Sequence, residues 1–106
     1  MFGVRGQAVR WVDDEPQPGW VEVHLLLADG TVAQLFDKPP VVDRDDRLRP
    51  DSAYPVPVTL ACAVEPSGAS HVVPGALLVT LAHGVSDQSG VSTFWVRQQD
   101  IVRAED

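Results

Sequence analysis

The chain has 106 residues, which fits one domain large enough to bury a hydrophobic core without disulfide or metal staples. Hydrophobic residues make up 44% of it, as in ordinary globular proteins, so the composition argues against disorder. Fifteen acidic and eight basic residues give a formal net charge of −7. This charge argues against binding to nucleic acids or acidic membranes, and it predicts a basic partner if charge steers binding.

The cysteine content and the absence of long apolar runs indicate in which cellular compartment the protein is expected. Cys62 is the only cysteine, so no disulfide can form within the chain. The first residues lack the apolar run of a signal peptide, and no stretch approaches the roughly 20 apolar residues of a membrane span. We therefore expect a cytoplasmic protein that makes no membrane contact.

The N-terminal part of the chain predicts one strand and one loop. Over residues 3–12, Val4, Ala8 and Val12 alternate on one face, while Gly6 on the same face suggests a bulge or a close backbone approach. Residues 13–19 are acidic and interrupted by two prolines, which predicts a loop.

Residues 20–36 carry the strongest pattern in the chain. Two β-prone runs flank Asp29-Gly30, a dipeptide suited to a tight turn in which both central residues have φ > 0. Period-two alternation places Glu22 and His24 on one face. The other face, expected to meet the core, holds Val21, Val23, Leu25 and Leu27.

Residues 37–57 form a long proline-rich loop without periodicity, in which acidic and basic side chains nearly cancel. Loops of this length in small domains are uncommon and often functional. The alternative is a structural crossover that closes a barrel and is held by local ion pairs.

The second half of the chain predicts further short strands. Residues 56–64 alternate cleanly, with Pro57 expected at an edge or a bulge, and a turn is predicted at residues 66–68. A strand near residues 71–73 is interrupted at Pro74-Gly75 and continues over 76–82. A polar loop at 83–90 leads to a strand at 91–96, a 3₁₀ turn at 98–100 and a closing segment at 101–102. In that last strand, Phe94 and Val96 share one face and Trp95 lies on the other.

These elements predict one all-β domain over residues 1–106, with five to seven antiparallel strands in a small barrel. The strand, 3₁₀ turn and short last strand are typical of SH3-like barrels, which are our first choice. An OB-like barrel is the second choice, and a two-sheet sandwich is the remaining alternative.

The residues whose side chains could take part in catalysis or bind a metal form no known catalytic or metal-binding motif. An EF-hand loop starting at Asp43 would need Gly and Glu where the chain has Leu48 and Tyr54. The three histidines match no zinc spacing, and Cys62 lies among apolar residues where it should be buried and inert. Glycine-rich phosphate loops, nucleophile elbows and HExxH motifs are absent. We therefore assign no catalytic residue, metal site or cofactor.

Three tryptophans are the candidate binding residues. Trp11, Trp20 and Trp95 fall opposite the apolar faces or at their ends, so they are expected to be partly exposed and to mark an interface. The alternative is a second small core beneath the long loop, in which Pro39 or Pro55 packs on the rings. An aromatic platform for single-stranded nucleic acid would need a basic groove beside it, and residues 14–28 contain no Lys or Arg.

Several short segments of the sequence resemble those of a group of small bacterial proteins to which no activity is assigned. They are Pro18-Gly19-Trp20-Val21-Glu22, Asp37-Lys38-Pro39-Pro40-Val41, Asp51-Ser52-Ala53-Tyr54-Pro55, Leu60-Ala61-Cys62-Ala63-Val64 and Phe94-Trp95-Val96. The resemblance implies a free-standing bacterial protein and carries no site residue with it.

Our leading hypothesis is a non-catalytic acidic interaction module that binds a protein partner or a second copy of itself. The binding residues would be the three tryptophans together with residues of the long loop: Trp11, Trp20, Trp95, Lys38, Arg47 and Tyr54. The alternative is a small-molecule or metal-dependent enzyme whose site lies under the loop, using Asp37, Asp43, Asp45 or His24.

Overall fold

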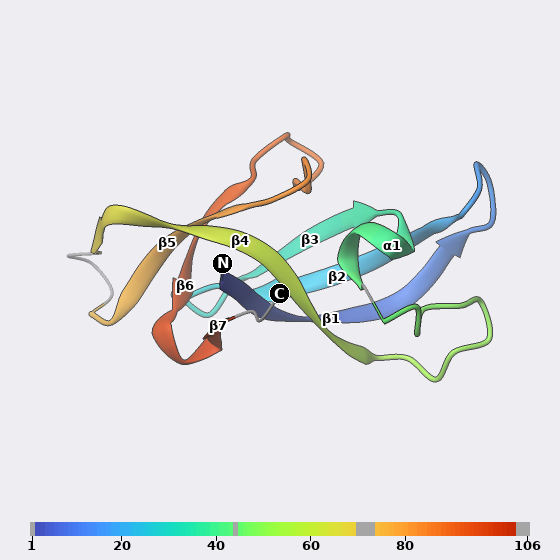
Figure 1. Ribbon diagram of the computed structural model, residues 1–106, viewed down its shortest axis with the longest axis horizontal. Helices are drawn as coiled ribbons and strands as arrows, with labels where there is room; N and C mark the ends of the chain where they lie inside the picture. The colour runs from blue at the N-terminus through green and yellow to red at the C-terminus, as the bar shows by residue number, and fades with distance from the viewer. Residues whose placement is uncertain (1, 44, 70–73, 104–106) are drawn as a thin grey trace.

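The computed structural model describes residues 2–43, 45–69 and 74–103. This part of the chain forms one seven-stranded antiparallel sheet with very little helix (Figure 1). The prediction of a small antiparallel all-β barrel is confirmed in the form of a curled half-barrel. Its elements are β1 (Phe2–Asp13), β2 (Trp20–Leu26), β3 (Val32–Asp37), α1 (Pro39–Val42), β4 (Val56–Ala69), β5 (Ala76–Leu81), β6 (Thr93–Arg97), the 3₁₀ turn η1 (Gln98–Asp100) and β7 (Ile101–Arg103).

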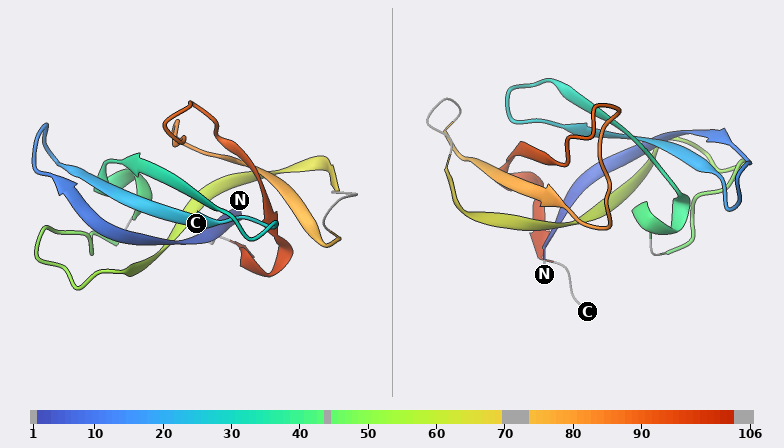
Figure 2. Two further views of the ribbon diagram at one scale, coloured as in Figure 1. Left: turned by 180° about the vertical axis from the view of Figure 1, so that it is seen from behind. Right: turned by 90° about the horizontal axis from the view of Figure 1, so that it is seen from above.

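The strand order is β3-β2-β1-β4-β5-β6, and β7 pairs with β1. Figure 2 shows how the sheet curls so that the β2–β3 hairpin approaches β6. Among the described residues, one backbone hydrogen bond and one isolated bridge join the hairpin side to the β6 side. The Ala28 amide donates to the Trp95 carbonyl at 2.9 Å, and Leu35 forms an isolated bridge with Asp87.

The central strand β1 has three partners on two edges. On one edge, residues 2–8 of β1 pair with β4. On the other, Phe2, Gly3 and Val4 pair with β7, while pairing with β2 begins only at Gln7 and continues to Asp13. Between Val4 and Gln7, β1 therefore passes from one neighbour to the next, and β2 and β7 diverge there.

The core lies inside the curl and follows the alternation of the strands. Val21, Val23 and Leu25 are fully buried, as the hairpin pattern predicted, and Phe94 and Val96 are buried on β6. Cys62 is a buried free thiol, also as predicted, and burial raises its pKa. The prediction for the last part of the chain is confirmed as well, since a strand, a 3₁₀ turn and a short strand follow one another.

The hairpin turn at residues 29–30 lies where the sequence predicted it but has a different conformation, and the turn predicted at residues 66–68 was wrong. At residues 29–30, only Gly30 has a positive φ (89°), and the Leu27 amide donates to the Thr31 carbonyl, so the loop has three residues instead of two. A three-residue loop with glycine in the left-handed region suits the twist of a hairpin equally well. The turn expected at 66–68 is absent because β4 continues to Ala69. The strand expected near residues 71–73 lies outside the described residues.

The long loop is shorter and more ordered than predicted. β3 extends to Asp37, one helical turn begins at Pro39, and β4 begins at Val56. Proline is favoured in the first turn of a helix because no partner is needed for its missing N–H. The proline-rich composition of residues 37–57 predicts a loop and does not indicate this helical turn. Among the described residues, no helix has the length and apolar character needed to cross a membrane.

Pro57 occupies an edge, as predicted. Its neighbour on β1 is Gln7, and β5 pairs with β4 only from Cys62 onward, which leaves the opposite edge of β4 without a strand at Pro57. The Pro57 carbonyl on that edge accepts a hydrogen bond from the Arg47 side chain at 2.7 Å. The missing N–H of proline therefore interrupts no ladder.

Gly19 should be the glycine least tolerant of substitution. Its φ is +102°, and an added Cβ would overlap the Trp11 ring and lie 2.9 Å from the Asp13 carbonyl oxygen. Gly30 has a similar φ of +89° but open space around it. We expect Gly19→Ala to lower the free energy of unfolding by about 3 kcal/mol and Gly30→Ala by about 1 kcal/mol, measured by urea denaturation. Equal losses would show that the contact with Trp11 does not matter.

Candidate binding groove

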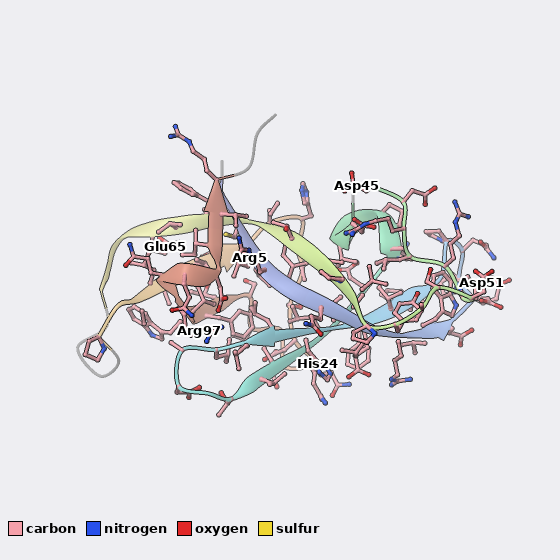
Figure 3. All side chains as sticks on the ribbon, turned by 90° about the horizontal axis from the view of Figure 1, so that it is seen from below. Arg5, His24, Asp45, Asp51, Glu65 and Arg97 are labelled. Carbon is pink, nitrogen blue, oxygen red and sulfur yellow. The ribbon has the colours of Figure 1, made fainter. Side chains whose placement is uncertain are left out.

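An open groove of about 730 Å³ crosses the outer face of the sheet over β1. It lies at the point where β2 and β7 diverge. Its charged and titratable side chains come from three strands, the long loop and η1: Arg5, His24, Asp45, Arg47, Arg97 and Asp100. In Figure 3, Arg5 and Arg97 lie at the end of β1 that pairs with β7, and His24 and Asp45 lie farther along on either side of β1.

The strand register gives the groove two unlike walls. On one side, Leu26 of β2 stands opposite Val32 of β3. On the other side, Arg5 of β1 stands opposite Thr59 of β4. If the antiparallel pairing continued beyond Gln7 and His24, Leu26 would lie opposite Arg5. However, β2 and β1 are not paired at these two residues. The groove therefore has Leu26 and Val32 on one side and Arg5 and Thr59 on the other.

Leu26 and Val32 are two of the six large apolar side chains that are exposed among the described residues. Their relative exposures are 39% and 49%, although the adjacent Leu25 is fully buried. Val9 also lines the groove. Leu26 and Val32 form the apolar wall, and Val9 belongs to β1, the strand that carries Arg5. Exposed apolar groups that gather in a concavity are typical of binding sites.

Two arginines of the groove are held in position by carboxylates. Arg97 donates from Nε and Nη2 to the two oxygens of Asp100, at 2.8 and 3.1 Å. Arg47 makes the same forked contact with Asp43, at 3.2 and 3.0 Å. Such forked pairs fix the plane of a guanidinium. Arg5, by contrast, is exposed and forms no ion pair within the described part of the chain.

A buried carboxylate orients His24. The Glu22 side chain is only 8% exposed although it was predicted to lie on the outer face. One of its oxygens accepts from Arg10 Nε at 2.6 Å, and the other lies 2.5 Å from His24 Nε2. Burial alone would raise the pKa of Glu22, but the hydrogen bonds from His24 and Arg10 hold it below its ordinary value. Cross-strand pairing of Arg10 with Glu22 brings this cluster together.

Asp43 anchors the segment after α1. Its side chain is 3% exposed and accepts from the Arg47 side chain and from the backbone amides of Asp45 and Arg47. Burial alone would raise the pKa of Asp43, but these hydrogen bonds lower it. With the Arg49–Asp46 pair at 2.9 Å, this network supports the interpretation of the loop as a structural crossover held by local ion pairs.

Trp11 and Trp20 lie on neighbouring strands at the far end of β1, away from the groove. Both are half-buried. Trp11 packs against the core and donates from Nε1 to Asp14 at 2.8 Å. The Lys38 ammonium lies 5.8 Å from the centroid of the Trp20 ring, a distance compatible with a cation–π contact. Trp20 and Lys38 are therefore brought together, whereas Trp11 pairs with Val21 and so lies on the face opposite to Trp20.

Trp95 lies apart from Trp20, and Tyr54 has contacts within the long loop. Trp95 is 38% exposed on β6, and its carbonyl contacts the β2–β3 turn, whereas Trp20 begins β2 about 20 Å away along the strand. Tyr54 packs against the core, and its hydroxyl donates to the Arg49 carbonyl at 2.6 Å. Of the six predicted binding residues, only Arg47 lines the groove.

Arg5, Leu26 and Arg97 were not predicted as binding residues. Arg5 had the signal of a charged residue on the outer face of a strand, but so did several others. Asp37 and Asp43, two residues named for the enzyme alternative, do not line the groove, whereas His24 and Asp45 do. The described residues contain no group of three His, Cys, Asp or Glu side chains placed to hold a metal ion.

No protein-family model, curated protein or solved structure is significantly similar to the chain. The function of the groove is therefore argued from the residues of the chain itself.

Replacement of Asp43 should destabilise the protein in a pH-dependent way. We expect Asp43→Asn to lower the free energy of unfolding by about 3 kcal/mol at pH 7, because Arg47 and two amides lose a buried charged acceptor. Since the folded-state pKa of Asp43 is lowered, its contribution is present above about pH 4 and is lost as the pH falls through the folded value. The difference in the free energy of unfolding between the wild type and Asp43→Asn should therefore become smaller at acidic pH.

The matched control is Asp51→Asn, because Asp51 is exposed. It should change the free energy of unfolding by no more than about 0.5 kcal/mol at any pH. Urea denaturation at several pH values between 7 and 2.5 provides the measurement. A loss in Asp43→Asn that stays constant with pH would contradict the proposed role of the carboxylate.

Proposed function

We propose that this protein is a non-catalytic interaction module that binds a protein partner, or a second copy of itself, in the groove over β1. The observation that carries the proposal is the pair of unlike walls, with exposed Leu26 and Val32 facing the side of Arg5. Exposed apolar residues beside arginine are characteristic of protein-binding surfaces.

The support for the groove is rigid. Its walls are strands of one continuous sheet, and the β1–β4 and β2–β3 ladders pair residue by residue behind them. The bonds to Asp43 and Asp100 orient Arg47 and Arg97 before any partner arrives. A site that is already ordered loses less entropy on binding, so modest contact area can yield useful affinity.

One observation favours a second candidate function, an enzyme that acts on a small molecule in the same groove. Glu22 lies within hydrogen-bond distance of His24 Nε2, and His24 lines the groove. A carboxylate that fixes the orientation of an imidazole is the usual support of a histidine that acts as a general base. Native mass spectrometry separates the candidates, because a dimer or a second polypeptide supports binding and a small-molecule adduct supports the enzyme.

Site-specific cross-linking tests the location of the binding surface. We expect a photoreactive amino acid at position 26 to give one discrete polypeptide adduct, which excess unmodified protein suppresses by competing for the same partner. The same amino acid at Val12 is the matched control. Val12 is also 39% exposed, but it lies near the far end of β1 and outside the groove. Identical adducts from both positions, or none from position 26, would argue against the groove as the binding surface.

A further inference from the structure

We propose that His24 makes occupancy of the groove depend on pH. Glu22 keeps a hydrogen on Nε2 of His24, so Nδ1 is the nitrogen that gains or loses a proton beside the apolar wall. The proposal rests on the proposed function, because it names the regulation of that same groove.

The ionised carboxylate of Glu22 determines which nitrogen of His24 carries a hydrogen. Burial would raise the pKa of Glu22, but the hydrogen bonds from His24 and Arg10 hold it below its ordinary value, so the group is ionised at neutral pH. An ionised carboxylate has no hydrogen to donate. Because His24 Nε2 lies 2.5 Å from Glu22 Oε2, Nε2 carries the hydrogen in both the neutral and the protonated imidazole.

The other ring nitrogen, Nδ1, is the one that exchanges its proton with solvent. The His24 side chain is 35% exposed, and Nδ1 forms no hydrogen bond within residues 2–43, 45–69 and 74–103. Every buried side-chain nitrogen or oxygen atom in those ranges has a hydrogen-bond partner. Nδ1 therefore lies at the surface, where it accepts a hydrogen bond when the ring is neutral and donates one when the ring is protonated.

The surroundings of His24 contain no other histidine. His24 lies two residues before Leu26, on the same face of β2, and the uncharged Gln7 and Gln34 stand opposite it on β1 and β3. His24 also lines a neighbouring cavity of about 390 Å³. Of the residue types around it, histidine alone ordinarily changes charge between pH 5 and pH 8. The charged side chains that line the groove or this cavity are Arg5, Asp45, Arg47, Asp87, Arg97 and Asp100.

A protonated His24 should oppose binding. Glu22 (−1), Arg10 (+1) and a neutral His24 together carry no net charge, whereas protonation of His24 raises their sum to +1. A partner whose apolar groups pack on Leu26 and Val32 would take this charge out of water, and an uncompensated charge is costly to remove from water. The groove should therefore bind its partner more tightly at pH 8 than at pH 5.

NMR spectroscopy of the isolated, isotopically labelled protein tests the state of His24. Between pH 8 and pH 5, we expect Nδ1 to take up a proton while the Nε2 hydrogen gives a low-field, slowly exchanging signal throughout. The methyl signals of Leu26 and Val32 should shift with the same midpoint. A neutral His24 with its hydrogen on Nδ1, or methyl signals that do not follow its titration, would overturn the proposal.

Two variants show whether the response belongs to His24. His24→Gln retains a donor for Glu22 but cannot titrate, so the methyl shifts of Leu26 and Val32 should disappear. His83→Asn should preserve them, because His83 is exposed and lies outside both cavities. Asparagine also tolerates the positive φ of 62° at that position. Shifts that persist in His24→Gln would show that another group causes them.

The photoreactive amino acid at position 26 tests the consequence for binding. The yield of its adduct should fall by about threefold or more between pH 8 and pH 5, and this fall should be lost in His24→Gln. A yield that is unchanged or higher at pH 5 would overturn the regulation. The absence of any adduct would contradict the proposed function alone, because the NMR measurements need no partner and decide the state of His24 by themselves.

Discussion

The double use of one edge of β1 is the constraint on which the rest of the structure depends. A strand has two edges, and β4 occupies one of them along residues 2–8. The other edge must serve both β7 and β2, so these strands take successive parts of it and diverge between them. An added Cβ at Gly6 would lie 3.1 Å from the His24 carbonyl oxygen, which shows how closely the backbones approach where β2 begins to separate. Closure through β7 and the position of the groove both follow from this division.

In this acidic chain, buried carboxylates hold arginine side chains in fixed positions. Glu22 and Asp43 are the two buried charged residues among those described, and each contacts an arginine. An unpaired buried charge is very costly in free energy. Each of these carboxylates therefore needs its contact with an arginine in order to be buried. The same pairing orients Arg47 in the wall of the groove.

Sequence reasoning succeeded where one local rule decided the outcome. Alternation identified the buried face of β2, because Val21, Val23 and Leu25 can only turn one side toward a core. It failed where two rules competed. Pro66 and Gly68 favour a turn, but the described backbone of β4 continues through them to Ala69. Pro39 and Pro40 were read as loop residues, although proline also suits the first turn of a helix.

The sequence by itself determined the all-β class, most strand positions, the burial of Cys62 and the 3₁₀ turn before the last strand, because each depends on neighbouring residues and on period-two alternation. Only the tertiary structure decided that Arg5, Leu26 and Arg97 meet around one groove while Trp20 and Trp95 lie apart. The physical reason is that these distances depend on strand order and register across the sheet. Pairing between strands far apart in the chain sets both, and no local pattern encodes them.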